Sequence, residues 1–124
     1  MSIQGSVKLD PDGAPGKGME PTAYVDPATV LEGRAKERGH TFFASKDGNF
    51  LVGVWECSPC KEKIDSYPFN EFCQVLSGTV TVTDKSGRSE TYRAGDSFFM
   101  HKGFEGIWDM TETFRKYFVI YAGD

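Results

Sequence analysis

Short apolar runs separated by turn residues dominate the sequence from residue 41 onward. The run FLVGVWEC (50–57) is rich in branched and aromatic side chains, and threonine alternates with valine in CQVLSGTVTVTD (73–84). Such runs recur about eight or nine times at intervals of roughly ten residues, with no long helical pattern among them. This pattern is typical of a sandwich or small barrel, so we predict an all-β fold.

Turn residues mark where these strands end. Asp84-Lys85-Ser86-Gly87 has the composition of a hairpin loop that returns the chain through RSETYRA (88–94). A second turn at Ala94-Gly95-Asp96 leads into SFFMH (97–101), and the runs GIWDM (106–110) and TFRKYFVIYA (113–122) follow. Each run is long enough for one strand of a small sheet.

The chain of 124 residues has the size of one domain. Residues 1–21 are dense in Pro, Gly and Asp and nearly free of apolar side chains, so we expect a flexible N-terminal arm before a single domain at 22–124. Asp26 and Pro27 offer an N-cap and a first-turn proline for a short helix ending near Gly39. Gly33 weakens that helix, which leaves a loop or a single helical turn as the alternative.

Composition excludes several classes of partner. The formal net charge is -4, which does not favour nucleic acid. The longest apolar runs are about five or six residues, against the ~20 of a membrane-spanning helix, so we expect no membrane partner. The start MSIQGSVKLDPDG lacks the charged and apolar parts of a secretory leader. We therefore expect a cytoplasmic protein whose three cysteines are free thiols.

Four residues with reactive side chains lie close together in IDSYPFNEFCQ (64–74). Glu71 and Cys73 share one face of a strand, and Asp65 and Tyr67 would share a face of the preceding segment. On an interior face they would bring an acid, a phenol and a thiol into an apolar wall, which is the environment of a functional carboxylate. The alternative is that Glu71 and Asp65 lie on the solvated face.

Cysteine and histidine offer a second set of candidates. Cys57 and Cys60 have the spacing of a zinc knuckle, with Cys73 and His101 as further ligands, but a second close pair is missing. Buried or turn cysteines are the favoured interpretation. For His101 we favour a strand-end residue that bonds to backbone or water.

Aromatic side chains offer a third candidate, a pocket wall. Trp55 and Trp108 are the preferred lining residues because an indole is hard to bury completely. Plain core packing is the alternative for each member of the set. The set comprises Trp55, Phe69, Phe72, Phe98, Phe99, Phe104 and Trp108.

Segments in the order GVWEC, EFCQVLSGTVTVTD, GDSFFMHKGFEGIW and FRKYFVIY, within 52–121, resemble the cupin superfamily. The resemblance is strongest to the branch of the ureidoglycine aminohydrolase cupin domain and the ethanolamine-utilisation cupin. It implies a double-stranded β-helix, or jelly-roll barrel, that is often a homodimer and binds its ligand inside the barrel.

The metal ligands of that superfamily are largely replaced. Glu71 and Gly78 match the end of the first motif, but the positions of its two histidines hold Asp65 and Tyr67, or Ile64 and Ser66 in the longer spacing. In the second motif Gly106 stands at the ligand histidine, and His101 takes the place of a proline. We expect no tightly held transition metal and no other cofactor. Asp65, Tyr67 and Glu71 are an oxygen-donor set that would hold at most a hard cation weakly.

Three functions follow from this pattern. The first is a cupin that binds a small polar organic metabolite without a metal, with Glu71 as its polar anchor. The second is an enzyme like the aminohydrolase branch, acting on a ureide, amine or carbohydrate-like metabolite, with Glu71 as general acid or base and Tyr67 or Cys73 assisting. The third is a non-catalytic accessory dimer. The expected pocket residues are Trp55, Asp65, Tyr67, Glu71, Cys73, Phe104 and Trp108.

Overall fold

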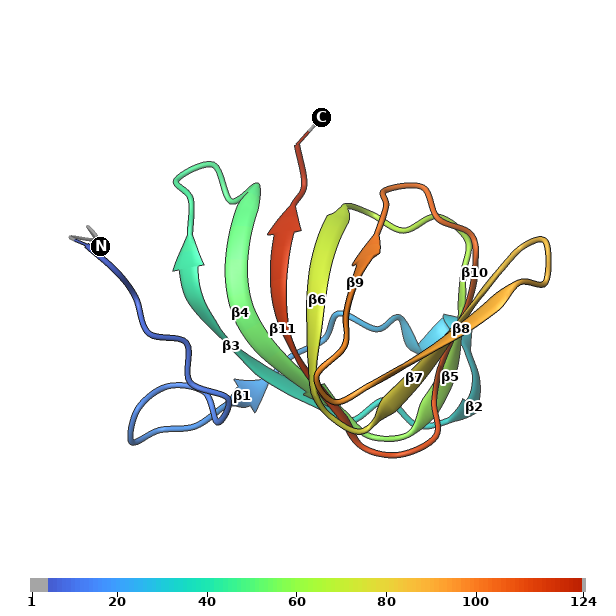
Figure 1. The fold of residues 1–124 in the computed structure, drawn as a ribbon, viewed down its shortest axis with the longest axis horizontal. Coiled ribbons are helices and arrows are strands. Elements are labelled where there is room, and N and C mark those ends of the chain that lie inside the picture. The colour runs from blue at the N-terminus through green and yellow to red at the C-terminus, as the bar shows by residue number, and fades with distance from the viewer. Residues whose placement is uncertain (1–4, 124) are drawn as a thin grey trace.

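The computed structural model describes residues 5–123, which form two antiparallel β-sheets facing each other (Figure 1). One sheet contains, in spatial order, β1 (Glu20–Pro21), β3 (Glu37–Ala44), β4 (Phe50–Cys57), β11 (Phe114–Tyr121), β6 (Asn70–Ser77) and β9 (Ser97–Met100). The other contains β2 (Val30–Gly33), β5 (Cys60–Ile64), β10 (Gly106–Met110), β7 (Thr79–Asp84) and β8 (Ser89–Arg93). The predicted all-β class is confirmed.

Side chains of both sheets fill the space between them. Along β11 every second residue from Phe114 to Ile120 is buried, and along β7 Val80 and Val82 are buried while the threonines are partly exposed. The period-two burial is the one that a half-buried strand requires. Phe114, Met110 and Val80 are among the least exposed large side chains and mark the centre of this core.

The region 26–39 is the main local departure from the expected helix. Asp26 does cap a helix, accepting a hydrogen bond from the Ala28 N–H at 2.9 Å, but the helix is the single 3-10 turn η1 (Pro27–Thr29). The chain then continues as β2 and, from Glu37, as β3. The helical-turn alternative is therefore correct, and the longer helix is wrong because both segments pair with strands of the sheets.

Part of the N-terminal arm contacts the outer face of the six-stranded sheet. The Tyr117 hydroxyl donates to the Leu9 carbonyl at 3.0 Å, and the Arg115 guanidinium donates to the Pro11 carbonyl at 2.8 Å and to Asp12 at 2.7 Å. Residues 1–4 of the expected arm lie outside the described residues. Flexibility of the arm in solution stays a prediction.

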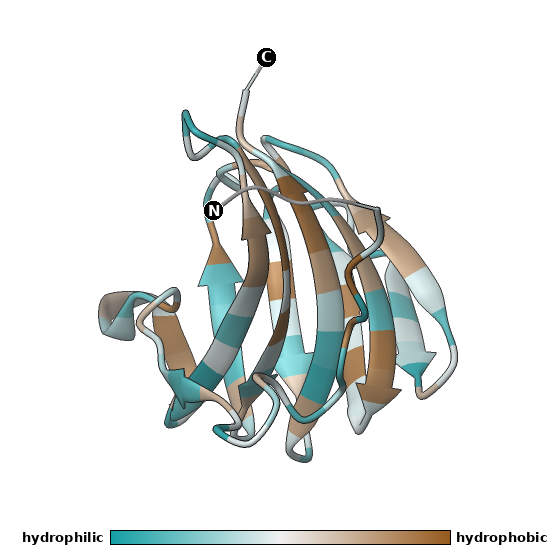
Figure 2. Cartoon of the chain, turned by 90° about the vertical axis from the view of Figure 1, so that its left-hand side faces the viewer, coloured by the Kyte–Doolittle hydropathy of each residue, from teal (hydrophilic) through white to brown (hydrophobic). Residues whose placement is uncertain are grey.

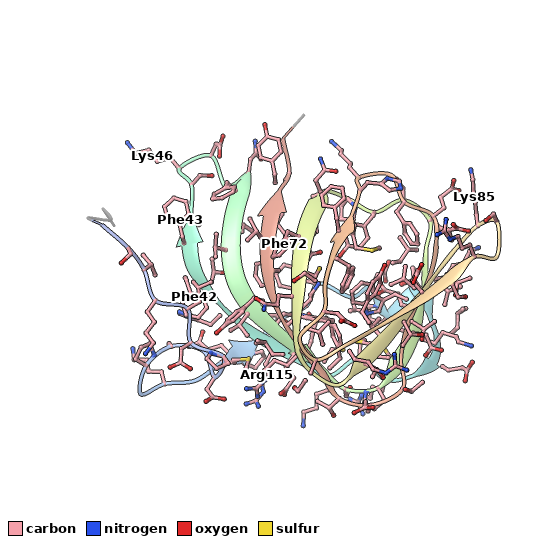
Figure 3. All side chains as sticks on the ribbon, in the orientation of Figure 1. Phe42, Phe43, Lys46, Phe72, Lys85 and Arg115 are labelled. Carbon is pink, nitrogen blue, oxygen red and sulfur yellow. The ribbon has the colours of Figure 1, made fainter. Side chains whose placement is uncertain are left out.

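The outer face of the same sheet carries a row of apolar side chains. Phe43 is opposite Val52, Val52 is opposite Val119, Val119 is opposite Phe72, and Phe72 is opposite Phe99. We call these five residues the apolar stripe; Phe72 and Phe99 are 46% and 61% exposed. Figure 2 shows apolar segments side by side on neighbouring strands, and Figure 3 labels Phe43 and Phe72.

Among residues 5–123, no helix is long and apolar enough to cross a bilayer.

Candidate functional site

A pocket of about 280 Å³ opens between the two sheets. Its floor and walls come from inward-facing residues of β4, β6 and β11 on one side and of β5 and β10 on the other. The loop from Asp65 to Phe69 and the segment from Tyr24 to Thr29 border it. Strands from both sheets thus contribute side chains to one cavity, which has the setting of a ligand-binding site.

Glu71 lies on the inner face of β6 and is 2% exposed. The Tyr67 hydroxyl donates a hydrogen bond to one of its carboxylate oxygens, and the Lys116 ammonium donates to the other at 2.6 Å. Of the two alternatives for this strand, the interior face is therefore the one the structure has. A carboxylate is stable at such a site only when it is paired and hydrogen-bonded, as Glu71 is.

Lys116 supplies a buried positive charge in the pocket. The sequence analysis did not identify this residue as a candidate. Its side chain is 6% exposed, and its Nζ lies 5.1 Å and 4.9 Å from the ring centroids of Trp55 and Trp108, within cation–π range. Burial opposes the charged ammonium, but the charge of Glu71 and its hydrogen bond with Lys116 raise the pKa of Lys116 above its usual value. The protonated ammonium is therefore the favoured form of Lys116.

A signal for Lys116 was present in the sequence. In FRKYFVIY the residues at 114, 116, 118 and 120 share one face of the strand, and three of them are large and apolar. A lysine in the middle of that set indicates an inward-facing charge, which requires an internal partner.

Glu37 connects the segment at the border of the pocket with Trp55 in its wall. This carboxylate is 8% exposed and accepts hydrogen bonds from the Trp55 indole N–H at 2.9 Å and the Thr22 hydroxyl at 2.7 Å. It also accepts from the backbone N–H groups of Tyr24 at 2.9 Å and Val25 at 2.8 Å. Burial raises the pKa of Glu37, but the hydrogen bonds from Trp55, Thr22 and the backbone outweigh it and lower the pKa overall. Glu37 therefore positions Trp55, and its charged form is the favoured one.

Five of the seven expected pocket residues line the cavity: Trp55, Asp65, Tyr67, Glu71 and Trp108. Asp65 is at its edge, with a side chain 76% exposed and an ion pair to Lys63 at 3.6 Å, so the solvated alternative holds for this acid. Burial raises the pKa of the Tyr67 phenol well above its usual value, and the charge of Glu71 adds to this effect.

Cys73 and Phe104 lie next to the cavity rather than on its lining. The Cys73 sulfur is 3.6 Å from the Lys116 Nζ, and burial raises the pKa of this thiol to about 12 although Lys116 opposes the change. Phe104 packs in the core, and its carbonyl accepts a hydrogen bond from the Tyr67 N–H at 2.9 Å. Both therefore support residues that do line the pocket.

His101 and the cysteine pair Cys57 and Cys60 lie away from the pocket lining. His101 is exposed, and its Nδ1 is 3.0 Å from the Lys102 carbonyl, in line with the favoured interpretation. Cys57 and Cys60 are buried at the turn between β4 and β5, and burial raises the pKa of both thiols. Near neutral pH both cysteines are therefore favoured as neutral thiols.

The residues between the sheets do not fit the transition metal that cupins commonly hold. Glu71 would be the principal donor, but its two oxygens are engaged by Tyr67 and Lys116, and the ammonium would repel a metal cation. Within 5–123, no three His, Cys, Asp or Glu side chains gather as a metal site. At Gly106, even a β-carbon would overlap the Thr83 carbonyl oxygen. A histidine side chain at this position would therefore not fit the present backbone.

The two facing antiparallel sheets and the pocket between them define a cupin jelly roll. Residues 44–118 match the family model of the EutQ-like cupin domain, and the chain belongs to that family. The resemblance seen in the sequence is thereby confirmed. A comparison with functionally curated sequences gives no match.

Solved structures share this fold. A DUF861-family protein of unknown function from Pseudomonas syringae pv. tomato superposes with a TM-score of 0.81 at 22% identity, covering 90% of this chain and 46% of that one. The chain thus spans about half the length of that protein. A proposed ethanolamine utilization protein, EutQ, from Salmonella typhimurium superposes with a TM-score of 0.62 at 16% identity. The match covers 86% of this chain and 98% of that one. A DUF861-family protein from Thermotoga maritima superposes with a TM-score of 0.51 at 29% identity. The match covers 55% of this chain and 76% of that one.

Proposed function

We propose that this cupin binds a small polar organic molecule in the pocket between its sheets, without a tightly held transition metal. The observation that carries the proposal is the buried cluster of Glu71, Lys116 and Tyr67 at an aromatic-walled cavity. Burying an ion pair costs desolvation energy that apolar residues of similar volume would avoid. A charged pair retained on a cavity wall is therefore better explained by ligand recognition than by stability alone.

The donor set supports the metal-free part of the proposal. Lys116 places a positive charge 2.6 Å from the carboxylate that would otherwise hold a metal. The negative charge of Glu71 is thus balanced by a side chain of the protein itself. Asp65 and Tyr67 add little as donors, since Asp65 is largely exposed and the Tyr67 hydroxyl already donates to Glu71.

The test is a thermal-shift screen with ureides, amines, sugars and organic acids, preceded by metal analysis of protein purified without chelators. We expect no stoichiometric Mn, Fe, Ni or Zn, and at least one class to raise the melting temperature, because a ligand of the native state stabilises it. In Glu71→Gln we expect that rise to be lost, whereas Glu112→Gln, an exposed acid outside the pocket, retains it. Stoichiometric metal, or an unchanged rise in Glu71→Gln, would contradict the proposal.

The geometry supports a catalytic role less well than a binding role. Burial keeps Cys73 a thiol near neutral pH, and both oxygens of Glu71 are engaged, so neither is poised for proton transfer in this arrangement. We therefore rank binding above the expected aminohydrolase-like activity on a ureide, amine or carbohydrate-like metabolite.

The apolar stripe supports a second proposal, that two copies form a homodimer through their six-stranded sheets. The stripe contains no charged residue, so it can face its own copy across a two-fold axis without opposing like charges. Such a dimer would also serve the accessory role considered above. Exposed aromatic side chains in one row are unusual for a surface that faces only water.

We expect the wild-type protein to have the mass of a dimer by light scattering and Phe99→Glu to have that of a monomer. The substitution would place a carboxylate against apolar partners in each copy. Arg93→Glu, on the other sheet, is the matched control and should remain dimeric. A monomeric wild type would rule out this assembly.

A further inference from the structure

Glu62 is the one acid of the pocket that the structure leaves without a strong partner. It lies on β5, opposite Trp108 of β10, and it lines the same cavity as Lys116. Its only hydrogen bond to residues 5–123 comes from the Thr29 hydroxyl, at a long 3.5 Å. Within that part of the chain it forms no ion pair. Burial raises the pKa of Glu62, which reflects a carboxylate that the protein solvates poorly.

The charges of the pocket do not balance. Its lining contains the acids Asp26, Glu62, Asp65 and Glu71 but only the bases Lys63 and Lys116. Lys116 is paired with Glu71, and Lys63 with Asp65. Asp26 is the N-cap of η1, and its side chain accepts a hydrogen bond from the Ala28 N–H. The surplus is negative, and Glu62 is the member of it that has no ion pair and no cap among residues 5–123, although the charge of Lys116 acts on it from a distance.

Aromatic rings surround this surplus charge. The lining includes Tyr24, Trp55, Tyr67, Phe69, Trp108 and Phe118. The face of an aromatic ring attracts a cation, and this attraction strengthens where water is excluded. The pocket already accommodates one ammonium in this way, that of Lys116 between Trp55 and Trp108.

We propose that Glu62 binds a protonated nitrogen of the ligand, so that the pocket selects small organic amines over neutral molecules of the same shape. This inference rests on the proposed binding function and names its ligand class. The ligand ammonium would provide Glu62 with the charged hydrogen bond that it lacks, while its apolar part contacts the aromatic walls. Glu71 would keep its pair with Lys116 and serve the polar part of the ligand from the other sheet.

The chain offers a direct reporter for this proposal. It contains two tryptophans, Trp55 and Trp108, and both line the pocket. The two indole N–H signals in a ¹H–¹⁵N NMR spectrum therefore report on the cavity from opposite sheets. Benzylamine and benzyl alcohol are suitable probes because they differ mainly in the charge of one terminal group.

We expect benzylamine to shift both indole signals and to bind about ten-fold more tightly than benzyl alcohol, as one charged hydrogen bond allows. In Glu62→Gln the affinity for benzylamine should fall about ten-fold, to the level of the alcohol, while that of the alcohol is unchanged. Glu112→Gln, with its exposed acid outside the pocket, should keep the preference. A melting curve of each variant establishes that it is folded.

Equal affinities for the two probes in the wild-type protein, or a preference for the amine that survives in Glu62→Gln, would overturn the role of Glu62. In both cases binding of either probe would leave the proposed function standing. If neither the two probes nor any compound of the thermal-shift screen moves an indole signal, the binding function falls together with this inference.

Discussion

Replacing Lys116 with methionine is expected to lower the free energy of unfolding by about 3–5 kcal/mol, the usual cost of breaking a buried ion pair from one side. Methionine fills much the same space but leaves the Glu71 carboxylate with the Tyr67 hydroxyl as its remaining partner. With both members of the pair at most 6% exposed, water from the cavity can replace the lost ammonium only in part. Urea unfolding followed by tryptophan fluorescence measures the change.

The double variant Lys116→Met/Glu71→Gln separates this explanation from a simple packing defect. Removing the orphaned charge should restore most of the lost stability, which appears as a large coupling between the two positions. Lys85→Met, which breaks an exposed ion pair with Glu105, is the matched control and should change the midpoint little. A Lys116→Met variant no less stable than this control would show that Lys116 is not charged in the folded protein.

Glu37→Gln is expected to cost about 2–3 kcal/mol at neutral pH, because the site is built from donors that a carboxylate accepts. One carboxylate oxygen accepts from Trp55, Thr22 and the Tyr24 N–H, and the other accepts from the Val25 N–H. Glutamine can replace only one of these oxygens, so its amide N–H₂ would oppose a donor. Loss of this contact should also loosen Trp55 and change its fluorescence.

The difference between wild type and Glu37→Gln should depend on pH with a definite sign. The pKa of Glu37 is lowered on folding from its model-compound value of 4.5, so its charged form stabilises the fold above that pH. This contribution is lost as the pH falls through the lowered pKa, and the two proteins should converge in acid. Urea midpoints measured from about pH 7 to about pH 3 test this. A difference that is constant over that range would contradict the assignment.

Strands with distinctive turns were predictable from the sequence. The runs at 50–57 and 106–110 coincide with β4 and β10, and the hairpin loop at 84–87 joins β7 to β8. By contrast, β2 and β3 lie in the charged stretch VLEGRAKERG and its continuation, where apolar alternation is weak. These strands are held by pairing with β5 and β4, a long-range effect that local pattern does not reveal.

The phase of β6 was not predictable for a related reason. Glu71 and Cys73 alternate with Phe72, so an acid and an aromatic residue compete for the interior face. The structure turns Glu71 inward, where Lys116 from β11 compensates its charge, and leaves Phe72 on the apolar stripe. Only the contact between Glu71 and Lys116, which lie on different strands and 45 positions apart in the sequence, resolves the choice.

The Lys116 ammonium also determines how the pocket acquires its charge. A metal centre depends on supply, can be lost to chelators and can be filled by the wrong ion. Here the cation next to Glu71 is a side chain of the polypeptide, carried by β11, which pairs with β6. The sequence itself therefore provides the partner of Glu71 at this point.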